Sequence, residues 1–104
     1  MNLPKVISDL VKAQDNFDST RYANCFTETA VVFDEGRTYN GKREIKNWIE
    51  KANKEYQVRM KPLGYSEGEK TLKAEISGSF PGSPVILTYQ YEFKNDLIQS
   101  LKIV

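Results

Sequence analysis

Residues 41–56 read GKREIKNWIEKANKEY and carry the clearest periodic pattern in the chain. Their apolar side chains recur three and four residues apart, which places them on one face of a helix: Ile45, Trp48, Ile49, Ala52 and Tyr56. Charged residues spaced by four occupy a neighbouring face, where opposite charges support a helix: Lys46, Glu50 and Lys54. The segment therefore predicts an amphipathic helix that buries one face.

Beyond this helix the pattern changes to the two-residue period of β-strands. Apolar and polar residues alternate over 72–80, and again over 85–93, where the apolar set is Val85, Leu87, Tyr89, Tyr91 and Phe93. Turn-forming residues fill 81–84 and 95–96, and residues 97–104 predict a last strand. Consecutive strands with short connections predict an antiparallel meander.

Before the helix, two shorter helices and a strand pair are expected. Leu3 to Phe17 carries a helical apolar pattern, and Asp18 is a suitable cap for a second helix with Tyr22, Cys25 and Phe26 inward. Ala30 to Phe33 predicts a strand, which Asp34-Glu35-Gly36 ends as a turn. Helices followed by antiparallel strands predict an α+β fold.

Composition narrows the function. The 104 residues suit one domain, 1–104, and hold 15 basic against 14 acidic side chains, so neither nucleic acid nor an anionic membrane is an expected partner. No segment resembles a signal peptide or a membrane span. The single cysteine, Cys25, suits a reducing cytoplasm. The absence of histidine excludes imidazole catalysis and histidine-bound metals, and we expect no metal and no cofactor.

Three stretches resemble the nuclear transport factor 2-like superfamily, in its SnoaL-like and ketosteroid isomerase-like branch. They are residues 22–31 (YANCFTETAV), 39–48 (YNGKREIKNW) and 89–98 (YQYEFKNDLI). The resemblance implies a cystatin-like cone in which three N-terminal helices pack on a curved, mostly antiparallel sheet and enclose a pocket. It also implies a homodimer formed through the outer sheet face, where Ile86 and Ile98 are expected.

Asp34 is the first candidate for a functional residue. It ends the run Ala30-Val31-Val32-Phe33-Asp34, which is similar to the run that carries the general-base aspartate of ketosteroid isomerases. Tyr89, or Gln90 if the alignment moves by one residue, falls where those enzymes hold a hydrogen-bond donor. The position of their other donor, a tyrosine, falls at or near Leu10. Alternatively Asp34 is a turn residue paired with Arg37, and Tyr89 is a core residue.

Two functions therefore stay open. The first is a small-molecule-binding domain, whose pocket is lined by apolar and aromatic side chains: Tyr22, Phe33, Trp48, Met60 and Tyr91. The second is an enzyme of ketosteroid isomerase or polyketide cyclase type that acts on a small apolar carbonyl compound, with Asp34 as base and Tyr89 as donor. Because the fold implies a pocket and not a reaction, the pattern favours the first.

Overall fold

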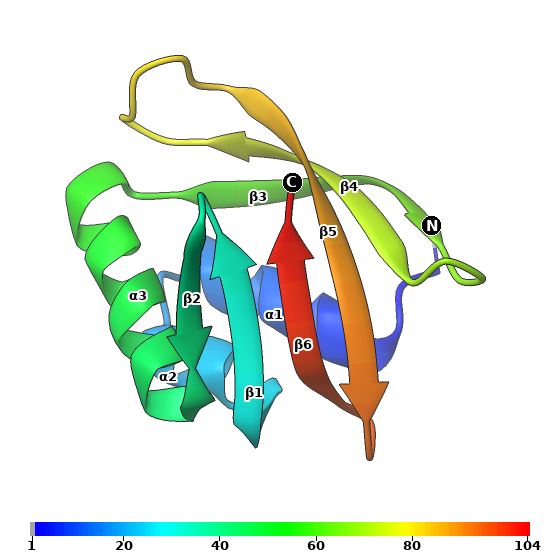
Figure 1. Ribbon diagram of the computed structural model, residues 1–104. Coiled ribbons are helices and arrows are strands. Elements are labelled where there is room, and N and C mark those ends of the chain that lie inside the picture. Colours follow the sequence, from blue (N-terminus) through cyan, green and yellow to red (C-terminus); the bar gives the residue numbers. More distant parts are fainter. Residues whose placement is uncertain (1) are drawn as a thin grey trace.

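The computed structural model describes residues 2–104, which form three helices and six strands (Figure 1). In chain order the elements are α1 (Lys5–Asp15), α2 (Ser19–Ala23), β1 (Phe26–Asp34), β2 (Arg37–Asn40), α3 (Gly41–Tyr56), β3 (Arg59–Ser66), β4 (Thr71–Ser77), β5 (Val85–Lys94) and β6 (Leu97–Ile103). The three helices lie on one face of the sheet. This arrangement confirms the α+β architecture.

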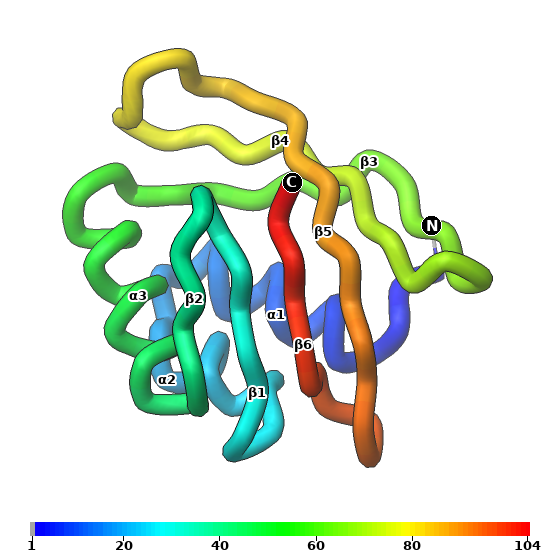
Figure 2. Tube along the Cα trace, viewed as in Figure 1, coloured from blue at the N-terminus to red at the C-terminus, as the bar shows by residue number. Residues whose placement is uncertain are grey.

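The six strands form one sheet in the order β2-β1-β6-β5-β4-β3. Strands β3 to β6 make the predicted antiparallel meander, and β1 is antiparallel to β2 but parallel to β6. The sheet therefore has two distinct ends along the strand direction. The β1–β2 turn and the end of β6 lie at one end, while the β5–β6 turn and the start of β1 lie at the other, as Figure 2 shows along the trace.

The first two helices end earlier than the sequence predicts. Helix α1 stops at Asp15, and Phe17 has a positive φ of 53° and is partly exposed. Helix α2 stops at Ala23, so Cys25 and Phe26 are not on it, and Phe26 begins β1. The expected cap is confirmed, because the Asp18 carboxylate accepts a hydrogen bond from the Arg21 backbone N–H at 3.0 Å.

The core lies between the helices and the inner face of the sheet, and its largest fully covered side chains include Phe26, Ile7, Leu10 and Leu101. Ile98 is also fully buried in this core, so its predicted place on the outer face was wrong. The pairing of β1 with β6 shifts between Phe26 and Val31, and the pairing of β5 with β6 shifts between Glu92 and Phe93. Such irregularities break strict alternation, so Ile98 and Leu101 both point inward although they are three residues apart.

Within residues 2–104, no helix is both long enough and apolar enough to cross a membrane.

Candidate functional site

Asp34 lies at the last position of β1, directly before a two-residue turn. Glu35 and Gly36 form this turn with φ values of 52° and 75°, the conformation that a tight hairpin requires. Successive side chains on a strand point to opposite faces, so Asp34 shares the inner face with the fully buried Val32. Asp34 therefore precedes the turn, and its side chain is half-buried on the inner face of the sheet.

Burial raises the pKa of the Asp34 carboxyl above its usual range, and the neighbouring Glu35 carboxylate raises it further. The Trp48 side chain, a hydrogen-bond donor close to the carboxyl, opposes these effects and lowers the pKa. Asp34 and Arg37 are opposite each other in the strand pairing, but no ion pair within residues 2–104 joins them. The environment of Asp34 thus favours a proton on the carboxyl more than water does.

Trp48, on α3, is the centre of an aromatic group beside Asp34. Its ring stacks on Tyr39 with centroids 5.4 Å apart and meets Tyr22 edge-on at 6.2 Å. Burial raises the pKa of the Tyr22 and Tyr89 phenols well above their usual range, and the Asp34 carboxylate adds to both shifts. Both phenols are therefore neutral hydrogen-bond donors at physiological pH. The structure brings together Asp34, Trp48, Tyr22 and Tyr89.

The remaining predicted site residues are placed elsewhere. Phe33 alternates with Val32 and Asp34, so it lies on the outer face and is 43 % exposed. Met60 is buried on β3, at the opposite edge of the strand order, where it pairs with Ile76. Tyr91 is buried and stacks on Tyr89 with centroids 6.4 Å apart. Of the predicted pocket residues, Phe33 is the one that faces away from the core.

The strand register separates the two residues that the sequence left as alternatives for the donor. Tyr89 is buried on the inner face of β5, whereas Gln90 is exposed. Of these two candidates, the phenol is the one that faces the core. Leu10, near which the resemblance places the other donor, is fully buried on α1.

A hollow in the described part of the chain lies at the other end of the strands. This hollow, which we name the α1 cleft, has a volume of about 1070 Å³. Its wall is formed by one side of α1, the residues that follow α2, the β3–β4 turn and the β5–β6 turn. Described lining residues include Val6, Cys25, Tyr65, Phe93 and Leu97, and none of the predicted site residues. Sequence reasoning did not find this cleft.

The rim of the α1 cleft is charged but balanced. It carries four basic and four acidic side chains: Lys5, Lys12, Arg21, Lys70, Asp9, Asp18, Glu67 and Asp96. Two ion pairs join members of this set, Lys5–Asp9 at 2.8 Å and Arg21–Asp18 at 3.5 Å. A cleft of this kind has no strong preference for an ion of either sign.

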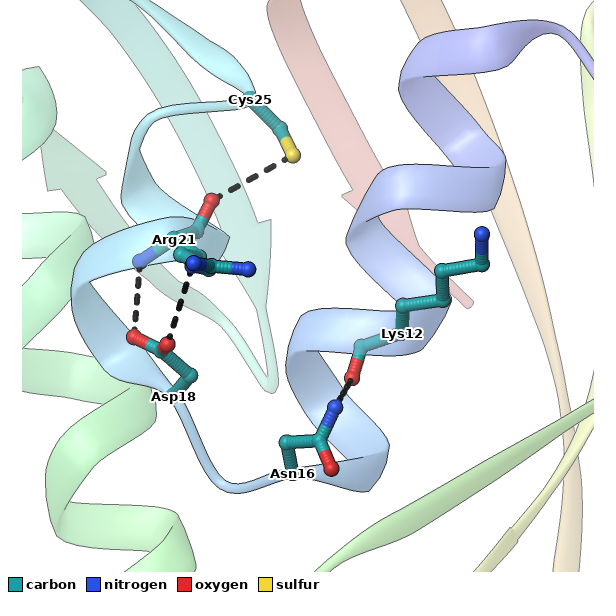
Figure 3. A network of polar contacts seen from close by, with 5 residues as sticks. All are labelled: Lys12, Asn16, Asp18, Arg21 and Cys25. Carbon is teal, nitrogen blue, oxygen red and sulfur yellow. Dashed lines mark hydrogen bonds and ion pairs between the residues drawn. The ribbon is translucent and has the colours of Figure 1, made fainter.

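Figure 3 shows the wall between α1 and the start of β1. The Asn16 side-chain amide donates to the Lys12 carbonyl at 2.9 Å, and the Cys25 thiol donates to the Arg21 carbonyl at 3.5 Å. Burial raises the pKa of the Cys25 thiol to about 11, with a further contribution from the Asp9 carboxylate. The thiol is therefore a packed, protonated group and not a nucleophile.

Metal binding has no visible support in the described chain. Residues 2–104 contain no cluster of three or more side chains of the acidic, cysteine or histidine type that could hold an ion.

Comparison with known proteins gives solved structures as relatives, while no protein-family model and no curated protein matches the chain. A Sinorhizobium meliloti protein provisionally named a polyketide cyclase is 34 % identical, with a TM-score of 0.92 over 98 % of this chain and 95 % of that one. A Catenulispora acidiphila protein with a ketosteroid isomerase-like fold, solved with trimethylamine, is 17 % identical with a TM-score of 0.86 over 99 % and 86 % of the two chains.

A third relative is a protein of Cytophaga hutchinsonii described as nuclear transport factor 2-like and of unknown function. It is 12 % identical, with a TM-score of 0.77 over 100 % of this chain and 90 % of that one. The two more distant relatives support the fold alone. The first relative, at 34 % identity over nearly all of both chains, supports a common family.

Proposed function

This chain belongs to the nuclear transport factor 2-like superfamily, in its SnoaL-like and ketosteroid isomerase-like branch, and on that premise we propose that it binds a small apolar molecule beside Asp34. One observation carries the proposal. A half-buried carboxyl with a raised pKa lies on the inner face of the sheet, where a purely structural core would hold an apolar side chain.

The groups around Asp34 indicate the chemistry of the ligand. Tyr22 and Tyr89 are neutral phenols, and the Trp48 ring adds apolar surface. A carbonyl or hydroxyl oxygen on an otherwise apolar molecule would accept a hydrogen bond from a phenol and leave no charge buried. The proposed ligand is therefore an uncharged apolar ketone or alcohol.

Binding can be followed through Trp48, the single tryptophan of the chain. Its indole N–H resonance should shift saturably when the protein is titrated with a set of small apolar ketones and alcohols. Asp34→Asn should change the affinity, whereas Asp96→Asn, which removes an acid at the opposite end of the strands, should not. If no compound of the set moves the indole resonance, the proposal is wrong.

The second candidate is an enzyme of the ketosteroid isomerase or polyketide cyclase type. The raised pKa of Asp34 favours it, because a carboxylate that holds a proton more readily is a better base, and so does the name of the 34 % identical relative. Asp34 would take the proton next to the carbonyl of the substrate, and a phenol would stabilise the enolate oxygen.

This reaction has a direct test. In deuterated water the enzyme would return a deuteron to the enolate, so the hydrogens next to the carbonyl of a bound ketone would be lost from its proton spectrum. The exchange should be faster with the native protein than with Asp34→Asn by about 100-fold or more. Equal rates for the two proteins would leave binding as the function.

We also propose a homodimer that forms through the outer face of the sheet. Phe33, Ile86 and Val104 are exposed large apolar side chains, and Ile86 is the most exposed at 63 %. Light scattering should give the mass of a dimer, and Ile86→Glu should give a monomer with an unchanged fold. A monomer mass for the native protein would contradict the proposal.

Two further proposals concern the domain organisation and the cellular location. We propose that residues 1–104 form one domain. We also propose that the protein is located in the cytoplasm, where a free thiol such as Cys25 stays reduced. A single resistant fragment after proteolysis at low protease concentration would support one domain. Recovery in the cytoplasmic fraction of the source cells would support the location.

A further inference from the structure

Tyr91 carries a hydroxyl group for which the fold provides no partner. Its oxygen is wholly covered, and no group in the described part of the chain accepts or donates a hydrogen bond there. Buried polar groups in proteins are nearly always paired, because an unpaired one loses its bonds to water without replacement. An unpartnered buried hydroxyl therefore indicates a bond that forms only when something else is present.

The neighbours of Tyr91 place it against the inner wall of the α1 cleft. Its ring stacks on Phe93 with centroids 5.6 Å apart and an interplanar angle of 11°, and Phe93 lines the cleft. Its backbone N–H donates to the carbonyl of Lys70 at 3.0 Å, and Lys70 is also a lining residue. Burial raises the pKa of the phenol most, followed by Tyr89 on the same strand and then by Tyr65 and Cys25, which both line the cleft. The hydroxyl is thus a neutral donor on a residue that stacks behind the lining residue Phe93.

The surface in front of this donor is apolar and partly aromatic. Phe93, Tyr65, Leu97 and Val6 line it, and each of these four side chains is only partly buried. Flat rings pack well against aromatic faces. A hydrogen bond from Tyr91 to a molecule in the cleft requires the side chains that cover its hydroxyl to move, and Phe93 and Leu97 are only partly buried.

The charge of the cleft limits the choice of ligand. Its four basic and four acidic rim residues cancel, and Lys5–Asp9 and Arg21–Asp18 are already paired with each other. A charged ligand would gain little from such a rim and would lose hydration on the apolar wall. The arrangement favours an uncharged compound.

We propose that the α1 cleft is a second ligand site, separate from Asp34, which binds an uncharged planar ring compound whose carbonyl oxygen accepts a hydrogen bond from the Tyr91 hydroxyl. The site combines a cleft of about 1070 Å³, a stacking wall and one unpartnered donor. Ligand sites generally consist of an apolar hollow with a few placed polar groups, and this cleft has both.

A matched pair of probes tests the proposal. 1-Tetralone has a planar aromatic ring and a carbonyl, and tetralin is the same skeleton without the oxygen. Titrations followed by backbone amide resonances should show saturable shifts at Val6, Tyr65 and Leu97 for 1-tetralone. Its affinity should exceed that of tetralin by roughly 3- to 10-fold, the usual range for one neutral hydrogen bond.

Two tyrosine variants separate the hydrogen bond from packing. Tyr91→Phe removes the hydroxyl and keeps the ring, so the preference for 1-tetralone over tetralin should disappear. Tyr89→Phe makes the same change two residues earlier on the same face of β5 and should keep the preference. Loss of the preference in both variants, or in neither, would overturn the proposal.

The outcome is independent of the function proposed for Asp34. Asp34→Asn should leave the shifts at Val6, Tyr65 and Leu97 unchanged. 1-Tetralone could instead shift the Trp48 indole resonance, with an affinity that Asp34→Asn lowers. The compound would then bind at the Asp34 end. This result would overturn the cleft inference and support the function proposed for Asp34. Absence of saturable binding by both probes overturns the cleft inference alone.

Discussion

The two ends of the inner sheet face share a turn geometry but differ in how they treat polar groups. Tight two-residue turns close both hairpins, Glu35–Gly36 at one end and Asn95–Asp96 at the other, and all four residues have positive φ. At the first end a half-buried acid lies beside Trp48 and neutral phenols. At the second end, charges stay on the rim of an open cleft and a phenol behind the wall is unpartnered.

The row of aromatic side chains on β5 connects these two ends. Phe93, Tyr91 and Tyr89 stack in sequence at centroid distances of 5.6 and 6.4 Å, with Phe93 in the cleft wall and Tyr89 near Asp34. One strand can supply side chains to both ends of the core, because its inward-facing residues recur every two positions along its length. The following predictions test whether the ends are as different as they look.

Trp48→Ala should have the largest effect, a loss of about 3 kcal/mol in the free energy of unfolding. This figure is at the low end for large aromatic truncations because Trp48 is only partly buried. The variant loses the stacking of Trp48 on Tyr39 and its edge-on contact with Tyr22. Since the chain has a single tryptophan, urea denaturation should be followed by circular dichroism.

A matched control is Phe33→Ala, which removes an aromatic side chain from the outer face. Phe33 is 43 % exposed, so the loss should stay below about 1 kcal/mol. If Trp48→Ala costs no more than Phe33→Ala, then the Asp34 end is an open surface and the contrast between the two ends is smaller than described.

Cys25 tests the chemistry of the cleft end. Its pKa of about 11 exceeds the ordinary 9.0 by two units, so its thiolate fraction at neutral pH is about 100-fold lower than that of a free thiol. Alkylation by iodoacetamide should be slower in the native protein by about that factor, and the rate should rise with pH until about pH 11. A native rate equal to the rate in denaturant would show that the thiol is solvated.

Sequence patterns predict the fold well because they repeat. The helix of 41–56 and the alternation of 85–93 are confirmed as α3 and β5, since each has enough periods to outweigh a single exception. The failures occur where one residue decides the structure. The end of α2 at Ala23 depends on a cap. The inward orientation of the Ile98 side chain depends on irregular strand pairing. Neither feature leaves a periodic signal in the sequence.

The two ends were unequally predictable from sequence. Asp34 ends a recognisable run of residues, whereas the α1 cleft is assembled from four segments that are separate in sequence. Lys5, Asp9 and Lys12 look like an ordinary solvated helix face, and three of the lining side chains belong to the β5–β6 hairpin: Phe93, Asp96 and Leu97. Only the tertiary arrangement shows that they surround one hollow.

Tyr91→Phe should raise the stability of the ligand-free protein by about 1 kcal/mol. The substitution removes a buried hydroxyl that has no partner, and such a group costs roughly 1–3 kcal/mol when it is left unpaired. Tyr89→Phe is the control and should give no such gain. Urea denaturation of the three proteins measures the difference, and a less stable Tyr91→Phe would mean that the hydroxyl has a partner in solution.

Asp34→Asn should have the smallest effect on stability, and its sign is the informative part. The folded state raises the pKa of Asp34 above its ordinary value of 3.8, so between these two values the folded chain binds more protons than the unfolded chain. The contribution of this group to stability is therefore fully present below pH 3.8 and is lost as pH rises through the raised pKa.

At neutral pH the ionised, half-buried carboxylate opposes folding, and solvent screening keeps this effect below about 1 kcal/mol. Asparagine has nearly the shape of aspartate but no charge, so the variant should be at least as stable as the native protein at neutral pH and lose this advantage below pH 3.8. Denaturation at a series of pH values measures the crossover, and an NMR titration of the Asp34 carboxyl should give a midpoint above 3.8. A midpoint below that value would make Asp34 an ordinary turn residue and remove the chemical difference between the two ends.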